Sequence, residues 1–93
     1  MTDLQFRELT VRWRAMFDQL MRLRQPVFQN HVPLGPDIYR ILTHSFNFLI
    51  INLQNYFPSR NGNYNILSGE LNRIHAVFTT FQTNCRLLRI PLQ

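Results

Sequence analysis

Lysine is missing from this chain, and acidic residues are scarce. All ten basic residues are arginine, against five acids, so the formal net charge is +5 at pH 7 and the pI is near 10.7. The guanidinium group is a flat fork of donors that suits phosphates, carboxylates and aromatic faces. This balance makes nucleic acid the first partner class to consider, ahead of anionic membranes and acidic proteins. Compositional bias, such as an overlapping reading frame in a compact viral genome imposes, is the alternative source of arginine without lysine.

Cysteine is almost absent too. Cys85 stands alone, so no disulfide can form within the chain and no oxidising compartment is implied. The mixed, polar N-terminal residues are unlike the apolar core of a signal peptide. No segment approaches the ~18 uninterrupted apolar residues that indicate a membrane-spanning helix. We therefore expect a soluble intracellular protein, cytoplasmic in the simplest case.

Patterns typical of catalysis or metal binding are also missing. His31, His44 and His75 fall on different predicted elements, without HxxxH or CxxC spacing, so no metal site is expected. No glycine-rich loop of the kind that holds phosphates is present. Cys85 lies on an apolar helical stripe, which is typical of a buried thiol and not of a nucleophile. We expect neither enzyme activity nor a cofactor.

Apolar residues at helical spacing, in contrast, are abundant. The chain is 45% hydrophobic with eight Phe, which indicates one folded domain over residues 1–93. The apolar period predicts helices over residues 3–25, 36–57 and 66–89. Prolines and a turn around Asn61 and Gly62 separate them. The predicted fold class is all-α, a three-helix antiparallel hairpin or bundle.

Dimerisation is expected to complete this small core. So much aromatic surface is hard to pack into a monomer of 93 residues, and most soluble oligomers are symmetric homo-oligomers. The alternative is a monomer in which several aromatic side chains stay half-exposed.

The central predicted helix, from Pro36 to Phe57, has two contrasting faces. One is apolar, and its members are Ile38, Leu42, Phe46, Leu49, Ile50, Leu53, Tyr56 and Phe57. The other carries one charge, Arg40, among neutral groups such as Asn47 and Gln54, with Ile51 in its midst. A helix that faces plain water usually carries more charge, so we expect this face to meet a polar partner.

The first predicted helix has acids at i,i+4 spacing from its arginines. The pairs are Asp3 with Arg7, Glu8 with Arg12, Arg14 with Asp18, and Asp18 with Arg22. Because such pairs attract on a helix surface, we expect the acids to match much of the positive charge. This helix is then the poorer candidate for an anion-binding face. Pro26 is expected to end it near Gln25.

A polar row follows the third predicted helix beside its apolar stripe. Its members are His75, Thr79, Gln82, Arg86 and Arg89. Their 4, 3, 4, 3 spacing places them on one line, and hydroxyls, amides and arginines are the groups that contact phosphates and sugars. Arg86 and Arg89 lack acidic neighbours. A solvated face whose last arginines complement the helix dipole is the alternative.

Together these patterns predict a basic helical module that binds nucleic acid through backbone contacts, without reading sequence. Double-stranded RNA is preferred, because long helices can run along its grooves. The predicted contact residues are Arg40, Asn47, Gln54, Arg60, Arg86 and Arg89. The rival is a protein–protein interaction adaptor or inhibitor with no nucleic-acid role, favoured by the expected exposure of Ile51. Association with an anionic membrane surface is a third hypothesis.

In size, helical hairpin, arginine bias and polar helix faces, the chain resembles the small viral B2 proteins that suppress RNA silencing. The resemblance implies a dimer that lays a face of arginine and polar residues along double-stranded RNA. It also implies a viral silencing suppressor as the biological role. It is a resemblance of architecture, which by itself does not fix function.

Overall fold

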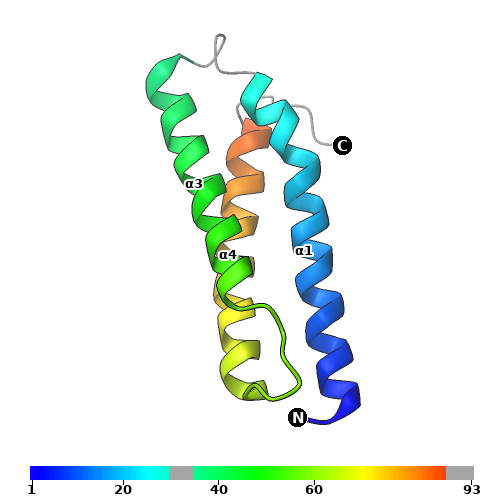
Figure 1. The fold of residues 1–93 in the computed structure, drawn as a ribbon. Helices are drawn as coiled ribbons and strands as arrows, with labels where there is room; N and C mark the ends of the chain where they lie inside the picture. The colour runs from blue at the N-terminus through cyan, green and yellow to red at the C-terminus, as the bar shows by residue number, and fades with distance from the viewer. Residues whose placement is uncertain (30–34, 88–93) are drawn as a thin grey trace.

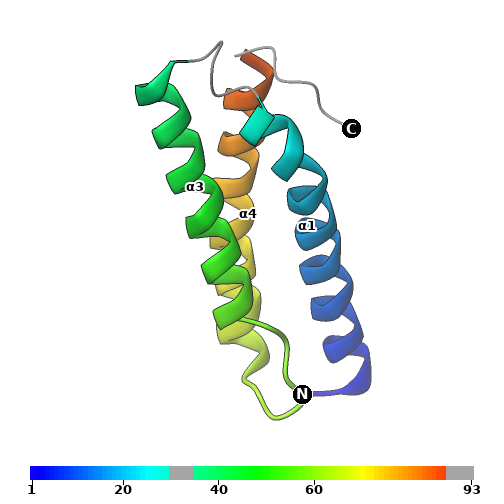
Figure 2. The same ribbon diagram turned by 45° about the horizontal axis from the view of Figure 1, so that its top comes forward.

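Three helices pack side by side in the computed structural model, which describes residues 1–29 and 35–87 (Figure 1). They are α1 (Asp3–Gln29), α3 (Pro36–Asn55) and α4 (Tyr64–Leu87). Each helix packs against both others, and α3 runs antiparallel to α1 and α4 in both views (Figures 1 and 2). The predicted all-α class is confirmed for this part of the chain. Within it, no helix combines the length and hydropathy needed to cross a membrane.

The first helix continues past Pro26 to Gln29, so the prediction that it ends near Gln25 is wrong. Proline cannot donate a hydrogen bond to the carbonyl one turn earlier, but its fixed φ of about −65° is itself helical. The residues that follow can therefore keep helical geometry. The predicted connector between the first two helices lies largely at residues 30–34, outside the described residues, as does His31.

A glycine and a proline begin α3. Gly35 has φ 81°, a conformation that L side chains rarely adopt, and Pro36 then occupies the first helical position, where its missing N–H costs nothing. The helix ends at Asn55, slightly before the predicted residue 57. At the start of α4, Asn63 accepts a hydrogen bond from the Ile66 N–H (3.1 Å), so this helix begins earlier than the predicted residue 66.

The core lies along the common axis of the three helices and is wholly apolar. Its buried members are Leu9, Met16, Leu20, Leu23, Leu42, Phe46, Leu49, Leu53, Leu71, Ile74, Phe78, Phe81 and Cys85. Among the described residues, no polar or charged side chain is buried. Ile38 and Phe57, both expected on the apolar face, are exposed. Ile38 lies in the first turn of α3, and Phe57 lies beyond its end, so the neighbouring helices do not fully cover either side chain.

Trp13 ties α1 to the C-terminal end of α3. Its Nε1–H donates to the backbone carbonyl of Leu53 (2.6 Å). Its ring stacks on Phe17, with centroids 4.9 Å apart, and meets Phe57 edge-on at 4.7 Å. Leu53 lies in the last turn of α3, and the last four carbonyls of a helix have no N–H donor within that helix. The indole therefore satisfies a group that α3 leaves open, and fixes how the two helices align.

Replacing Trp13 with Phe should lower the free energy of unfolding by about 1–3 kcal/mol, because the Leu53 carbonyl loses its donor while most ring packing remains. Urea denaturation followed by circular dichroism measures this. Val11→Ala, at an exposed site on the same helix, is the control and should change stability by less than about 0.5 kcal/mol. Equal midpoints for the two variants would contradict the role of Trp13.

Candidate nucleic-acid interface

The residues predicted to contact nucleic acid lie at separate places in the bundle. Arg40, Asn47 and Gln54 are exposed on α3 and stand seven residues apart, so they form one line. Arg86 lies in the last turn of α4, at the end of the bundle where α3 begins (Figure 1). Arg60 lies in the link between α3 and α4, at the other end. Arg89 lies outside the described residues.

Two of these arginines already have acidic partners. Arg40 Nη2 lies 2.6 Å from Asp37 Oδ1, one turn earlier on α3. Arg60 pairs with Asp3 at the start of α1, and its guanidinium lies over the Phe6 ring, 4.6 Å from the centroid. Exposed ion pairs are worth only ~0–1 kcal/mol, so a phosphate could displace the acids. Until then each pair is nearly neutral, and both arginines attract a polyanion less than an unpaired one does.

Asp3 and Glu8 do not pair with the arginines of α1, which corrects the expectation from spacing, and Asp18 lies between Arg14 and Arg22 without an ion pair to either among the described residues. Within residues 1–29 and 35–87, none of the i,i+4 pairs expected on α1 is an ion pair. Asp3 pairs with Arg60 instead, and Glu8 accepts a hydrogen bond from the Tyr64 hydroxyl (3.1 Å). That hydrogen bond raises the pKa of Tyr64. These partners lie far away in sequence, so helical spacing could not reveal them.

The surplus positive charge therefore gathers on α1. The exposed arginines without an acidic partner, among the described residues, are Arg7, Arg14, Arg22, Arg24 and Arg86. All but the last belong to α1. Arg7 and Arg14 stand seven residues apart and share the outward face of the helix. The helix that sequence spacing disfavoured is the strongest candidate for an anion-binding face.

A groove between α1 and α3 joins this face to part of the predicted site. It encloses about 300 Å³, and its lining residues are Phe17, Met21, Arg24, Phe46, Asn47, Ile50 and Gln54. Asn47 and Gln54 therefore form one wall, and Arg24 stands on the other. The polar line on α3 borders α1 and is not an isolated face.

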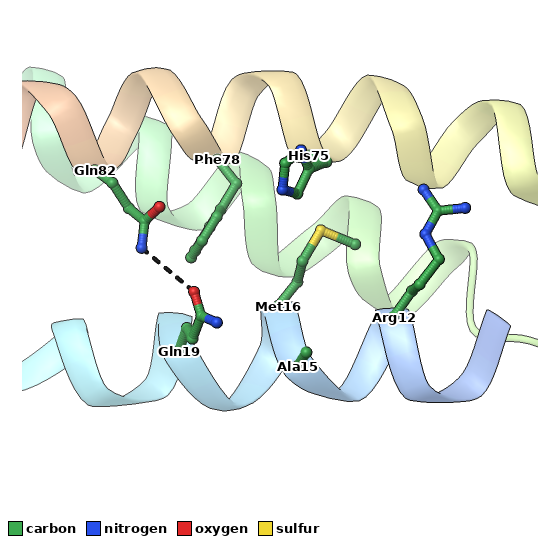
Figure 3. Close-up of a pocket in the computed structure, with 7 residues that line it drawn as sticks. All are labelled: Arg12, Ala15, Met16, Gln19, His75, Phe78 and Gln82. Atoms are coloured by element: carbon green, nitrogen blue, oxygen red, sulfur yellow. Dashed lines mark hydrogen bonds between the residues drawn. The ribbon is translucent and has the colours of Figure 1, made fainter. Parts of the chain in front are cut away.

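A second groove, of about 330 Å³, lies between α1 and α4 (Figure 3). Its lining residues are Arg12, Ala15, Met16, Gln19, His75, Phe78 and Gln82. Gln82 Nε2 donates to Gln19 Oε1 across the groove (3.4 Å). Arg12 reaches Ser68 Oγ (3.4 Å) and Asn72 on α4. Two members of the polar row predicted on the third helix, His75 and Gln82, thus face α1.

Thr79 in that row, and Thr83 one turn further along α4, are weaker candidates for phosphate contacts than their hydroxyls suggest. Thr79 Oγ1 donates to the His75 carbonyl and Thr83 Oγ1 to the Thr79 carbonyl, both at 3.0 Å. A hydroxyl has one proton, and phosphate oxygens need donors. These side chains can accept a hydrogen bond from a sugar hydroxyl, but they have no proton left for a phosphate.

Neither a metal site nor a reactive thiol is found in the described part of the chain. No three of its His, Cys, Asp and Glu side chains come together where a metal ion could bind. Cys85 is fully buried in the core, and burial raises its pKa from 9.0 to about 11. Because the thiolate is the reactive form, this cysteine is a packing residue.

Comparisons with known proteins add no relative. No protein-family model matches the chain, and no curated protein or solved structure is significantly similar to it.

Cys85 should react with iodoacetamide at pH 8 at least about 100-fold more slowly in the folded chain than in urea, because the raised pKa lowers the thiolate fraction and the core blocks access. Mass spectrometry of timed samples measures the rate. The Cys85→Ser variant should take up no label. Similar rates in both states would show that Cys85 is not held in the core.

Proposed function

We propose that this chain binds nucleic acid, with a preference for double-stranded RNA, through backbone contacts made by the face centred on α1. The observation that carries the proposal is the set of exposed arginines on α1 that have no acidic partner within the described residues: Arg7, Arg14 and Arg22 on the outward side, and Arg24 at the groove toward α3. The two grooves that flank α1 add amide side chains on either side of this helix.

Phosphate contacts supply most of the affinity in sequence-independent binding. The 27 residues of α1 make a rod of about 40 Å, at 1.5 Å per residue. From Arg7 to Arg24 the helix rises about 25 Å at the same 1.5 Å per residue. A duplex carries one phosphate charge per ~1.7 Å of its axis, so these arginines span many phosphates of a duplex that lies along α1.

The flanking amides favour RNA over DNA in this proposal. Asn47 and Gln54 on one side, and Gln82 on the other, both donate and accept hydrogen bonds. The 2′-hydroxyl is itself a donor and an acceptor, and it is the group that separates RNA from DNA. Neutral amides beside arginines therefore suit a sugar–phosphate backbone, and no sequence reading is needed.

The aromatic residues near α1 favour a duplex over a single strand. Single-strand binders stack unpaired bases on exposed rings. Trp13 and Phe17 stack on each other and are half-buried, and the Arg60 guanidinium lies over Phe6. These rings are already in contact with protein groups, so they are poor platforms for bases. If the chain coats duplex RNA as a homodimer, suppression of RNA silencing is the biological role that fits.

A protein-interaction module is the second candidate function. Ile51 is 53% exposed on α3, and Ile41, on the same side of that helix, is 63% exposed. Phosphates gain nothing from such side chains, whereas a protein interface buries them. On this alternative the chain is an adaptor or inhibitor, and its basic charge plays no specific part.

The double variant Arg14→Ala with Arg22→Ala should weaken duplex RNA binding about 10- to 100-fold and reduce the slope of log affinity against log salt by about two. Two counterion-releasing contacts would be lost, similarly for every RNA sequence. Fluorescence anisotropy with labelled duplex RNA, duplex DNA and single-stranded RNA across a salt series measures both quantities.

The charge-matched control is Arg40→Ala with Arg60→Ala, which removes arginines that have acidic partners. It should lose clearly less affinity than the α1 variant. Equal losses would mean that net charge alone matters and that α1 is not the binding face. Wild-type binding that is weak and disappears at physiological salt would reject the nucleic-acid function and favour a protein partner.

A further inference from the structure

Of the seven exposed large apolar side chains outside α1 among the described residues, all but Ile38 and Phe57 lie along the seam between α3 and α4. On α3 they are Ile41 (63% exposed), Phe48 (38%) and Ile51 (53%), and on α4 they are Ile66 (62%) and Leu87 (76%). Ile41, His44, Phe48, Ile51 and Asn55 follow one another at 3, 4, 3, 4 spacing and form one stripe. Seven-residue steps likewise join Ile66, Arg73, Thr80 and Leu87 in one row.

Hydrogen bonds show that both rows flank the same seam. Arg73, in the row on α4, donates to Asn52 Oδ1 on α3 (2.9 Å). Asn52 in turn donates to the carbonyl of Phe48, one turn earlier on α3 (2.8 Å). On α3, Asn47, Ile50 and Gln54 instead line the groove between α3 and α1. The two rows therefore make one surface, which we name the α3–α4 face, on the side of α3 turned away from α1.

The α3–α4 face has no surplus charge, although the chain carries +5. Arg73 is the one arginine in the two rows, and its guanidinium lies 2.8 Å from Glu70, one turn earlier on the same helix. The remaining members of the rows are apolar or neutral hydrogen-bonding groups. The face thus differs in kind from the arginine-bearing face of α1.

We infer that a second copy of this chain docks on the α3–α4 face to form a two-fold symmetric dimer. A two-fold interface sets one patch against the same patch of the partner. On α1 such pairing would bring unpaired arginines against each other, whereas on the α3–α4 face it brings apolar rows together without like-charge repulsion. An acidic protein or a polyanion would be attracted to α1 instead.

The dimensions of the face suit a stable dimer. The 20 residues of α3 span about 30 Å, and two adjacent helices, 8–10 Å apart, are roughly 20 Å wide with their side chains. The footprint is then about 600 Å² per copy, close to the ~800 Å² that a standard stable interface buries on each partner. The inference does not depend on nucleic-acid binding, because it concerns the opposite side of the bundle.

Sedimentation velocity and light scattering on the full chain, across a concentration series without nucleic acid, test this inference. The wild type should show twice the chain mass of 11.2 kDa. Raising the salt concentration should leave the dimer intact or strengthen it, since its interface is apolar and neutral. A wild type that is monomeric at every concentration would overturn the inference, whatever its affinity for RNA.

Two variants locate the interface. Phe48→Asp and Ile51→Asp each set a charge against its own copy in the dimer, and each should raise the dimer dissociation constant at least about tenfold. Val11→Asp makes the same kind of change at an exposed site (61%) on α1 and should leave the dimer intact. Circular dichroism checks that all three fold, and if Phe48→Asp does not, Ile51→Asp alone decides. A dimer that withstands both changes on α3, or that Val11→Asp disrupts equally, would overturn the assignment of the face.

Discussion

The closure of three apolar stripes around one axis is the constraint on which the rest of this structure depends. The core is formed by apolar side chains, and the Thr43 hydroxyl is the one buried side-chain polar atom without a hydrogen-bond partner among the described residues, so a helix rotation that carried further polar groups inward would cost stability. Once Leu9, Met16 and Leu20 face the axis, helix geometry places Arg7 and Arg14 outward. The arginine face of α1, which is the proposed binding surface, is thus a consequence of the core.

The bundle consequently has two unlike sides. Unpaired arginines project from α1, where, among the described residues, Asp3 and Glu8 contact other elements and Asp18 forms no ion pair. Paired or neutral groups and exposed apolar side chains occupy the α3–α4 face. Association through the second side would leave both copies of the first exposed. The two proposed contacts, with a polyanion and with a second copy, would therefore not compete.

Sequence pattern predicts the interior of this fold well and its surface chemistry poorly. The buried positions on α3 and α4, from Leu42 to Cys85, follow from apolar period alone, because helical geometry repeats locally. Ile38 and Phe57 were misjudged since their exposure depends on where the neighbouring helices end. The partners of Asp3 and Glu8 could not be read from spacing, because Arg60 and Tyr64 come close only after the chain has folded.

The candidate site, like the fold, could be predicted only in part from the sequence. The polar character of Asn47 and Gln54 was visible in the sequence, but their position across a groove from Arg24 was not. The ion pair of Arg40 with Asp37 could have been predicted from the sequence, because the two residues are one helical turn apart. The unpaired arginines of α1 could not be predicted, because local spacing suggested acidic partners on the same helix. In the folded chain Asp3 and Glu8 contact Arg60 and Tyr64 instead.

The chain also contains its own optical probe. It has one tryptophan, and the indole of Trp13 is hydrogen-bonded to α3 and stacked on Phe17, on the side of α1 turned toward its neighbours. Separation of α1 from α3 would expose this ring to water and alter its fluorescence. A ligand on the outer surface of α1 would leave it in place. Intrinsic emission can therefore distinguish opening of the bundle from occupation of its surface, without any label.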